Sequence, residues 1–162
     1  MGGSVSDEEW ERAVAEVWAT AAERSDDDVI AAIAVLAQQR PDGDAAALFE
    51  RASAHDYAGQ EALAEPLYRA ALTAGLDAER RPRAVIQLAS TLRNLGRPQD
   101  SIDLLLADRD AEDDLGDART AFLALALMDA GRPADAVRYA LEALAAHLPQ
   151  YQRAVRYYAS EL

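Results

Sequence analysis

The sequence predicts an all-α fold in which short helix pairs stack side by side into a solenoid, and three observations lead to this prediction. Alanine supplies 38 of the 162 residues, whereas glycine and proline supply only 8 and 6, and such a composition favours helices. Apolar residues recur at spacings of three and four, as on one face of a helix. A block centred on Gly-Arg-Pro occurs twice, 35 residues apart. Because one short hairpin cannot bury both of its apolar sides, neighbouring hairpins must stack.

Composition and charge exclude several functional classes. Cysteine is absent and all 16 basic residues are arginine, so cysteine nucleophiles, disulfides and lysine chemistry are ruled out. The net charge of −13 argues against nucleic acid and anionic membranes as partners. No apolar run approaches the roughly 18 residues that span a bilayer, and no secretory signal is visible. We therefore expect a cytoplasmic protein without cofactor or metal, and the alanine- and arginine-rich composition is typical of a bacterial genome rich in G and C.

We expect residues 1–5 to form a flexible N-terminus and residues 6–162 to form a single helical domain. A first helix pair is predicted over residues 6–40. Ser6 is a suitable cap for its first helix, and Ser25 or Asp26 for its second. The apolar stripe of the first helix consists of Trp10, Val14, Val17, Trp18 and Ala21, and that of the second of Val29, Ile30, Ile33, Leu36 and Ala37.

Three further helix pairs and a final helix follow, with short connections that place successive helices antiparallel. The predicted helices span about 44–58, 60–74, 78–95, 98–109, 116–130, 133–147 and 150–161. Each of these pairs is interrupted by a glycine at position 59, 96 or 131. A glycine at a helix end is typical of a residue with left-handed backbone geometry. Two of the three second helices begin with proline, whose missing N–H costs nothing in a first turn.

The repeat also places small residues at matching positions of each pair, where two helix backbones can approach closely. These residues are Ala52, Ala89 and Ala124 in the first helices, and Ala64, Ser101 and Ala136 in the second helices.

With these residues the chain resembles the tetratricopeptide repeat family, whose unit of about 34 residues is a helix–turn–helix. The resemblance covers residues 45–149 as three degenerate repeats, with residues 6–40 and 150–161 as flanking helices, the latter as a cap. Asp108 and Ala140 depart from the family pattern, which has alanine and a large residue there. The chain also looks like small uncharacterised members of the family from actinobacteria. The resemblance implies a right-handed superhelical α-solenoid that acts as a non-enzymatic scaffold for protein–protein interaction.

In this family the first helix of each repeat lines a concave groove that holds a partner peptide. Carried over, the groove residues of the central helix are Arg83, Ile86, Ser90, Arg93 and Asn94, and Gln87 lies on the same polar stripe of a helical wheel. The flanking repeats contribute Ser53, Asp56, Tyr57, Met128 and Asp129. The stripe combines two arginines with amide and hydroxyl side chains, and these groups can donate hydrogen bonds to a peptide carboxylate or to acidic side chains. The alternative is that this stripe is the solvated face of an amphipathic helix.

Other candidate sites have weaker patterns. The acidic run 108–114 lacks the glycine and glutamate of a calcium loop, so a solvated acidic loop is expected, with weak cation binding as the alternative. His55 has no triad or metal partner at a suitable spacing and is expected to be buried or half-buried between helices. His147 is expected to cap a helix C-terminus.

The last helix interleaves arginine and tyrosine, which is compatible with stacking on nucleic acid. A stripe at helical spacing instead favours a capping helix that closes the end of the solenoid. The stripe consists of Tyr151, Val155, Tyr158 and Leu162.

The sequence thus predicts a protein–protein interaction module that binds a peptide or protein segment. One alternative is a regulatory protein. The other is a self-assembly module that forms a homodimer, in which Trp10 and Trp18 of the first helix contact a second copy. No nucleophile–base pair, metal set or phosphate loop suggests an enzyme.

Overall fold

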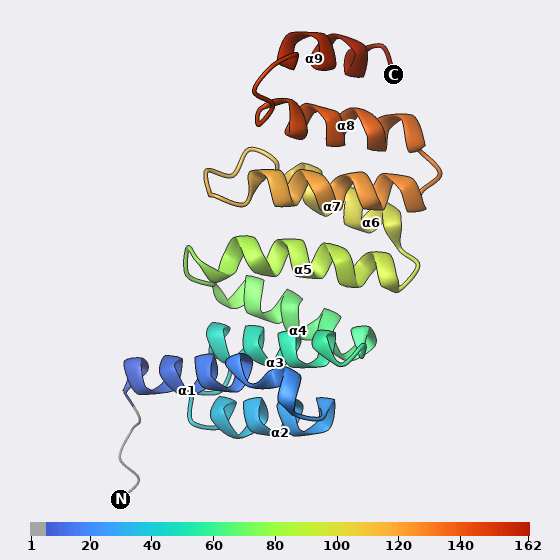
Figure 1. The fold of residues 1–162 in the computed structure, drawn as a ribbon. Helices are drawn as coiled ribbons and strands as arrows, with labels where there is room; N and C mark the ends of the chain where they lie inside the picture. Colours follow the sequence, from blue (N-terminus) through green and yellow to red (C-terminus); the bar gives the residue numbers. More distant parts are fainter. Residues whose placement is uncertain (1–5) are drawn as a thin grey trace, which may run out of the picture. The chain divides into compact units, whose positions relative to one another are not determined.

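The computed structural model describes residues 6–162, and within that range the chain forms helices and no strand (Figure 1). The predicted flexible N-terminus, residues 1–5, lies outside the described residues. The α-helices are α1 (Asp7–Ala19), α2 (Asp26–Ala37), α3 (Ala45–Tyr57), α4 (Glu61–Ala74), α5 (Arg80–Asn94), α6 (Pro98–Ala107), α7 (Gly116–Asp129), α8 (Pro133–Ala145) and α9 (Gln152–Ser160). A 3-10 turn, η1 (Ala21–Glu23), follows α1. The predicted fold class, all-α helix pairs, is confirmed.

The chain divides into two compact units, one through Ala84 and one from Val85 onward, so that the boundary falls inside α5. That residues 6–162 form one domain stays a prediction.

The first unit begins with the helix cap that the sequence predicts. The Ser6 hydroxyl accepts a hydrogen bond from the Glu9 N–H at 3.3 Å, and the Glu9 carboxylate accepts one from the Ser6 N–H at 3.1 Å. This reciprocal pair satisfies two backbone donors at the start of α1. Helix α1 ends at Ala19, before Ala21, the last residue of its predicted apolar stripe. At this end the Thr20 hydroxyl donates to the carbonyl of Glu16 at 2.9 Å.

The predicted apolar stripes of the first helix pair form the core of the first unit. Trp10, Val14 and Val17 of α1 are buried together with Val29 and Ile33 of α2. Partly buried neighbours pack against them and include Trp18, Ile30, Leu36 and Ala37.

Three turns repeat with the same backbone geometry after α3, α5 and α7. Gly59, Gly96 and Gly131 have φ angles of 68°, 74° and 73°, in the left-handed region that glycine adopts without strain. In each turn the residue after the glycine donates its N–H five residues back, for example from Arg97 to the carbonyl of Leu92 at 2.9 Å. The glycine itself donates three residues back, as in the Schellman motif. The repeat seen in the sequence is therefore a repeat of local structure.

The small residues predicted at close helix contacts are all buried. They are Ala52, Ala64, Ala89, Ser101, Ala124 and Ala136, with 0–9 % of their surface exposed. In the first unit, Phe49 of α3 and Tyr68 of α4 fill the adjacent space, with ring centroids 6.1 Å apart. Leu88, Leu92, Ile102, Leu105 and Leu127 are large residues of the second unit that are almost completely buried.

The predicted stripe on the last helix is wrong. Tyr151, Tyr158 and Leu162 are exposed by 77 %, 68 % and 56 %, and Ala159 is the buried residue of α9. Helix α9 packs against α8, and it follows a left-handed residue, Tyr151, with φ of 68°. The small side chain of Ala159 is therefore buried on this helix, and the tyrosines are exposed.

The acidic run 108–114 is only partly a solvated loop, because Asp108 is buried. Its carboxylate oxygen Oδ2 lies 3.0 Å from Nε of the buried Arg119, and Asp113 Oδ2 lies 2.6 Å from Nη2 of the same arginine. Asp108 stands where the tetratricopeptide pattern has alanine, and Arg119 balances its charge. Within residues 6–162, no group of three or more histidine or carboxylate side chains is arranged to hold a metal ion. None of the helices described is long and apolar enough to cross a membrane.

Candidate binding surface

The predicted groove residues are divided between the two units. Ser53, Asp56, Tyr57 and Arg83 belong to the first unit. Ile86, Gln87, Ser90, Arg93, Asn94, Met128 and Asp129 belong to the second unit.

In the second unit, candidates from two different helices come together. Nε of Arg93 on α5 lies 2.6 Å from Oδ2 of Asp129 on α7. Met128 precedes Asp129 and is 52 % exposed, and Leu125, one helical turn earlier, is 46 % exposed. Two exposed apolar side chains thus lie next to a charged pair that joins the first helices of consecutive repeats.

The remaining candidates of α5 differ in how accessible they are. Asn94 is exposed, and Ser90 and Gln87 are half-buried. Ile86 is only 7 % exposed, so its prediction as a groove residue is wrong. Helix α5 is buried over most of its circumference, since Ala84, Val85, Ile86, Leu88 and Ala89 are all buried. This coverage leaves only a narrow polar strip at the surface.

In the first unit, two candidates point into the helix pair rather than to its surface. The buried Tyr68 hydroxyl donates to Asp56 Oδ2 at 3.2 Å and lies 3.4 Å from Ser53 Oγ. Burial raises the pKa of Tyr68 far above its usual value, and the negative charge of Asp56 raises it further, so the phenol stays a donor. Ser53 is 8 % exposed, which corrects the prediction that it lines an open groove.

The other two candidates of the first unit are exposed. Tyr57 is 49 % exposed and makes an edge contact with Trp18, with ring centroids 6.0 Å apart. The Arg83 guanidinium lies 5.4 Å from the centroid of the Phe49 ring, within the range of a cation–π interaction.

A comparison with known protein families agrees with this geometry. The family model described as tetratrico peptide repeat matches residues 45–162, which includes the three glycine turns, both sets of candidates and α9. The chain belongs to the tetratrico peptide repeat family. Proteins of this family generally mediate protein–protein interactions and are typically non-enzymatic scaffolds. A search of curated proteins and a search of solved structures gave no match.

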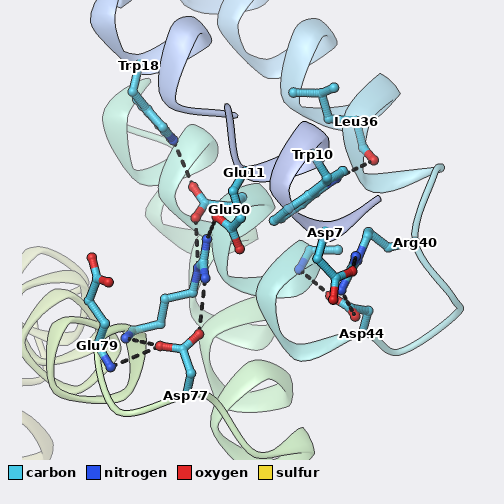
Figure 2. A network of polar contacts seen from close by, with 12 residues as sticks. Asp7, Trp10, Glu11, Trp18, Leu36, Arg40, Asp44, Glu50, Asp77 and Glu79 are labelled. Atoms are coloured by element: carbon cyan, nitrogen blue, oxygen red, sulfur yellow. Dashed lines mark hydrogen bonds and ion pairs between the residues drawn. The ribbon is translucent and has the colours of Figure 1, made fainter. Parts of the chain in front are cut away.

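At the N-terminal edge of the matched region, the structure shows a polar network that sequence reasoning missed (Figure 2). Glu50 of α3, only 4 % exposed, accepts hydrogen bonds from Trp18 Nε1 at 2.8 Å and from Arg80 Nε at 3.1 Å. Arg80 also pairs with Asp77 and with Glu11 of α1. Burial alone would lower the pKa of Arg80, but its hydrogen bonds to Glu11, Asp77 and Glu50 raise it, so the guanidinium stays charged.

This network joins the helices that precede the tetratrico peptide repeat match to the first repeat. Trp10 has the guanidinium groups of Arg40 and Arg80 at 5.1 Å and 5.8 Å from its ring, and its Nε1 donates to the Leu36 carbonyl at 2.9 Å. Apart from the local Asp77–Arg80 pair, these hydrogen bonds and ion pairs span 26 to 69 residues of sequence, so no local pattern indicates them. Trp10 is 1 % exposed, which removes it from the predicted homodimer contact.

Each of the two histidines contacts a polar side chain. His55 is half-buried, as predicted, and its Nδ1 lies 2.8 Å from Gln60 Oε1. His147 is exposed, and its Nε2 lies 2.7 Å from Oδ2 of Asp117, at the start of α7. Its ring therefore contacts a carboxylate rather than the carbonyls at the end of α8.

Proposed function

We propose that this tetratrico peptide repeat protein is a non-enzymatic interaction module that binds a protein or peptide segment on one face of its second unit. This surface, the α5–α7 face, consists of Arg93, Asn94, Leu125, Met128 and Asp129. The observation that supports it most is the 2.6 Å contact between Arg93 and Asp129, which joins the first helices of two consecutive repeats. The composition supports a cytoplasmic bacterial setting for this scaffold.

The chemistry of the α5–α7 face defines the segment that it suits. Met128 and Leu125 offer apolar surface that a partner side chain can cover, and full burial of one such side chain is worth about 1.5–3 kcal/mol. Arg93 and Asp129 are partly exposed, at 20 % and 45 % of their side chains, and can exchange hydrogen bonds with polar groups of a partner. We therefore expect a segment with an apolar anchor flanked by acidic or amide side chains.

Arg83 and Tyr57 are proposed as contacts on the first unit. Their exposure permits a partner to reach them, whereas Ser53 and Asp56 support Tyr68 from within the helix pair. The alternative reading, a merely solvated polar stripe, does not account for the exposed Leu125 and Met128 beside it.

A peptide-display experiment tests the α5–α7 face. Peptides selected on the wild-type protein from a random library are synthesised with a fluorophore, and their affinity is measured by anisotropy. Met128→Ser and Leu125→Ser should each weaken binding about tenfold, equivalent to about 1.4 kcal/mol. The matched control is Val137→Ser on α8, an apolar residue that is 45 % exposed. Equal affinities for the Met128 and Val137 variants would show that the peptides bind elsewhere.

A further inference from the structure

Helix α9 presents an aromatic and basic surface that the rest of its unit does not cover. Tyr157 and Tyr158 are 60 % and 68 % exposed, with ring centroids 5.6 Å apart. Arg153 lies one helical turn before Tyr157, on the same side of the helix, and Arg156 is also exposed. Among the described residues, no carboxylate lies within ion-pair distance of either arginine. We call Arg153, Arg156, Tyr157 and Tyr158 the α9 surface.

The first helix pair carries a surface of complementary character. A pocket of about 350 Å³ opens between α1 and α2 and is lined mainly by aliphatic side chains, among them Val17, Val35 and Leu36. Val35 is 58 % exposed and forms part of its rim. Glu16 and Arg24 are the charged residues of the lining. Arg24 donates to Thr20 Oγ1 at 3.0 Å, whereas the Glu16 carboxylate has no ion pair within residues 6–162.

The two surfaces also have opposite charge. Residues 7–37 contain nine acidic side chains and two arginines, a net charge of −7. Helix α9 contains two arginines and no acidic residue, and with Glu161, which follows it directly, residues 152–162 carry a net side-chain charge of +1. The α9 surface is therefore attracted to the first helix pair of another molecule, and salt weakens this attraction.

We propose that the α9 surface of one copy docks on the α1–α2 pocket of a second copy. A tyrosine ring enters the aliphatic pocket, and Arg153 pairs with Glu16. A second copy is the favoured occupant of the α1–α2 pocket, because every molecule carries both complementary surfaces and the two are therefore present at the same concentration. Since the two surfaces are different, the contact is heterologous, and further copies can add at either free surface.

The expected association is weak and reversible. Each aromatic side chain buries at most about 150–250 Å². Two such rings and a salt bridge therefore give an interface smaller than the roughly 1,200 Å² of stable complexes. The wild-type protein should be monomeric when dilute and form larger species as its concentration rises.

Sedimentation velocity with two blocked variants tests the proposal. Val35→Asp blocks the pocket, and the double variant Tyr157→Ser/Tyr158→Ser blocks the α9 surface. All three positions are exposed, so both variants should keep the far-UV circular dichroism of the wild type. Each variant alone should be monomeric at concentrations where the wild type associates. Mixed together they should form a 1:1 complex and nothing larger, because one intact surface of each kind remains.

The charge pairing has its own test. Arg153→Glu and Glu16→Arg should each reduce association, and a mixture of the two variants should restore it through the reversed pair.

Three results would overturn the proposal. A wild type that stays monomeric up to about 1 mM, equivalent to less than about 4 kcal/mol of binding free energy, would show that the two surfaces do not associate. Self-association of the Val35→Asp variant would indicate an α9–α9 contact. A mixture of the blocked variants that gives no 1:1 complex would show that the two surfaces do not meet. Met128→Ser, which tests the proposed peptide-binding face, should leave self-association unchanged.

Discussion

Asp108 is a buried charged residue at a position where the repeat pattern has alanine, and it is paired with the buried Arg119. The effect of this pair on the stability of the fold can be tested quantitatively. Arg119 is 3 % exposed and Asp108 is 8 % exposed, with the two groups 3.0 Å apart. Replacing Arg119 by methionine keeps most of the apolar stem but removes the cation that lies 3.0 Å from the buried Asp108 carboxylate. Removing one partner of such a pair costs about 3–5 kcal/mol. For a chain of this size that corresponds to a fall of about 6–20 °C in Tm.

The double variant Asp108→Ala/Arg119→Met should recover most of this loss, because it restores the alanine of the repeat pattern and removes both charges. Asp108→Ala alone should cost less than Arg119→Met, since Arg119 keeps Asp113 at 2.6 Å. Urea denaturation followed by far-UV circular dichroism gives the free energies of unfolding for the full cycle. If the double variant is no more stable than Arg119→Met, the two residues are not coupled, and the reasoning from their burial fails.

Three further predictions concern stability and are checked by thermal or urea denaturation. Ser101 has a buried hydroxyl without a hydrogen-bond partner in the described structure, so Ser101→Ala should stabilise the protein by about 1 kcal/mol. The control is Ser53→Ala, which removes a hydroxyl next to the buried Tyr68 phenol and should not stabilise the protein. Gly96→Ala should lower the free energy of unfolding by about 1 kcal/mol, because the φ of 74° is unfavourable for alanine, whereas a Cβ at this position would meet no other atom. The control is Gly116→Ala, where φ is not positive and a Cβ also meets no other atom. Equal effects of the two substitutions would contradict the argument from the backbone geometry of the turn. Partial burial raises the pKa of Asp77, but hydrogen bonds to its carboxylate outweigh this and hold the pKa below its usual value. Its contribution to stability is therefore present above pH of about 4 and lost as pH falls below that, and Asp77→Asn should flatten this acid limb of the stability profile.

The parts of the fold that depend on local chemistry could be predicted from the sequence. Gly59, Gly96 and Gly131 end their helices in the left-handed geometry expected, because this conformation is accessible to glycine without strain. The Ser6 cap depends on contacts within four residues and was likewise predictable. Such features need no knowledge of which helices become neighbours.

Features that depend on tertiary coverage could not be derived in this way. A helical wheel shows the polarity of Ile86 and Ser53 but not how much of each helix its neighbours cover, and both residues are buried. The stripe on α9 was wrong because a helical wheel does not show which face of the helix becomes buried, and that face carries Ala159. The pairing of Asp108 with Arg119 was hidden since nothing in the spacing of an acidic loop indicates a buried cation.

The placement of the two indoles gives this protein an optical reporter of one half of the chain. Trp10 and Trp18, the only tryptophans in the sequence, both belong to α1 and hence to the unit that ends at Ala84. One ring is flanked by guanidinium groups and the other donates to a buried carboxylate, so their emission should shift when these contacts are lost. Ellipticity, in contrast, averages over all helices. Heating curves recorded by both signals therefore test whether the unit that ends at Ala84 melts together with the rest of the chain.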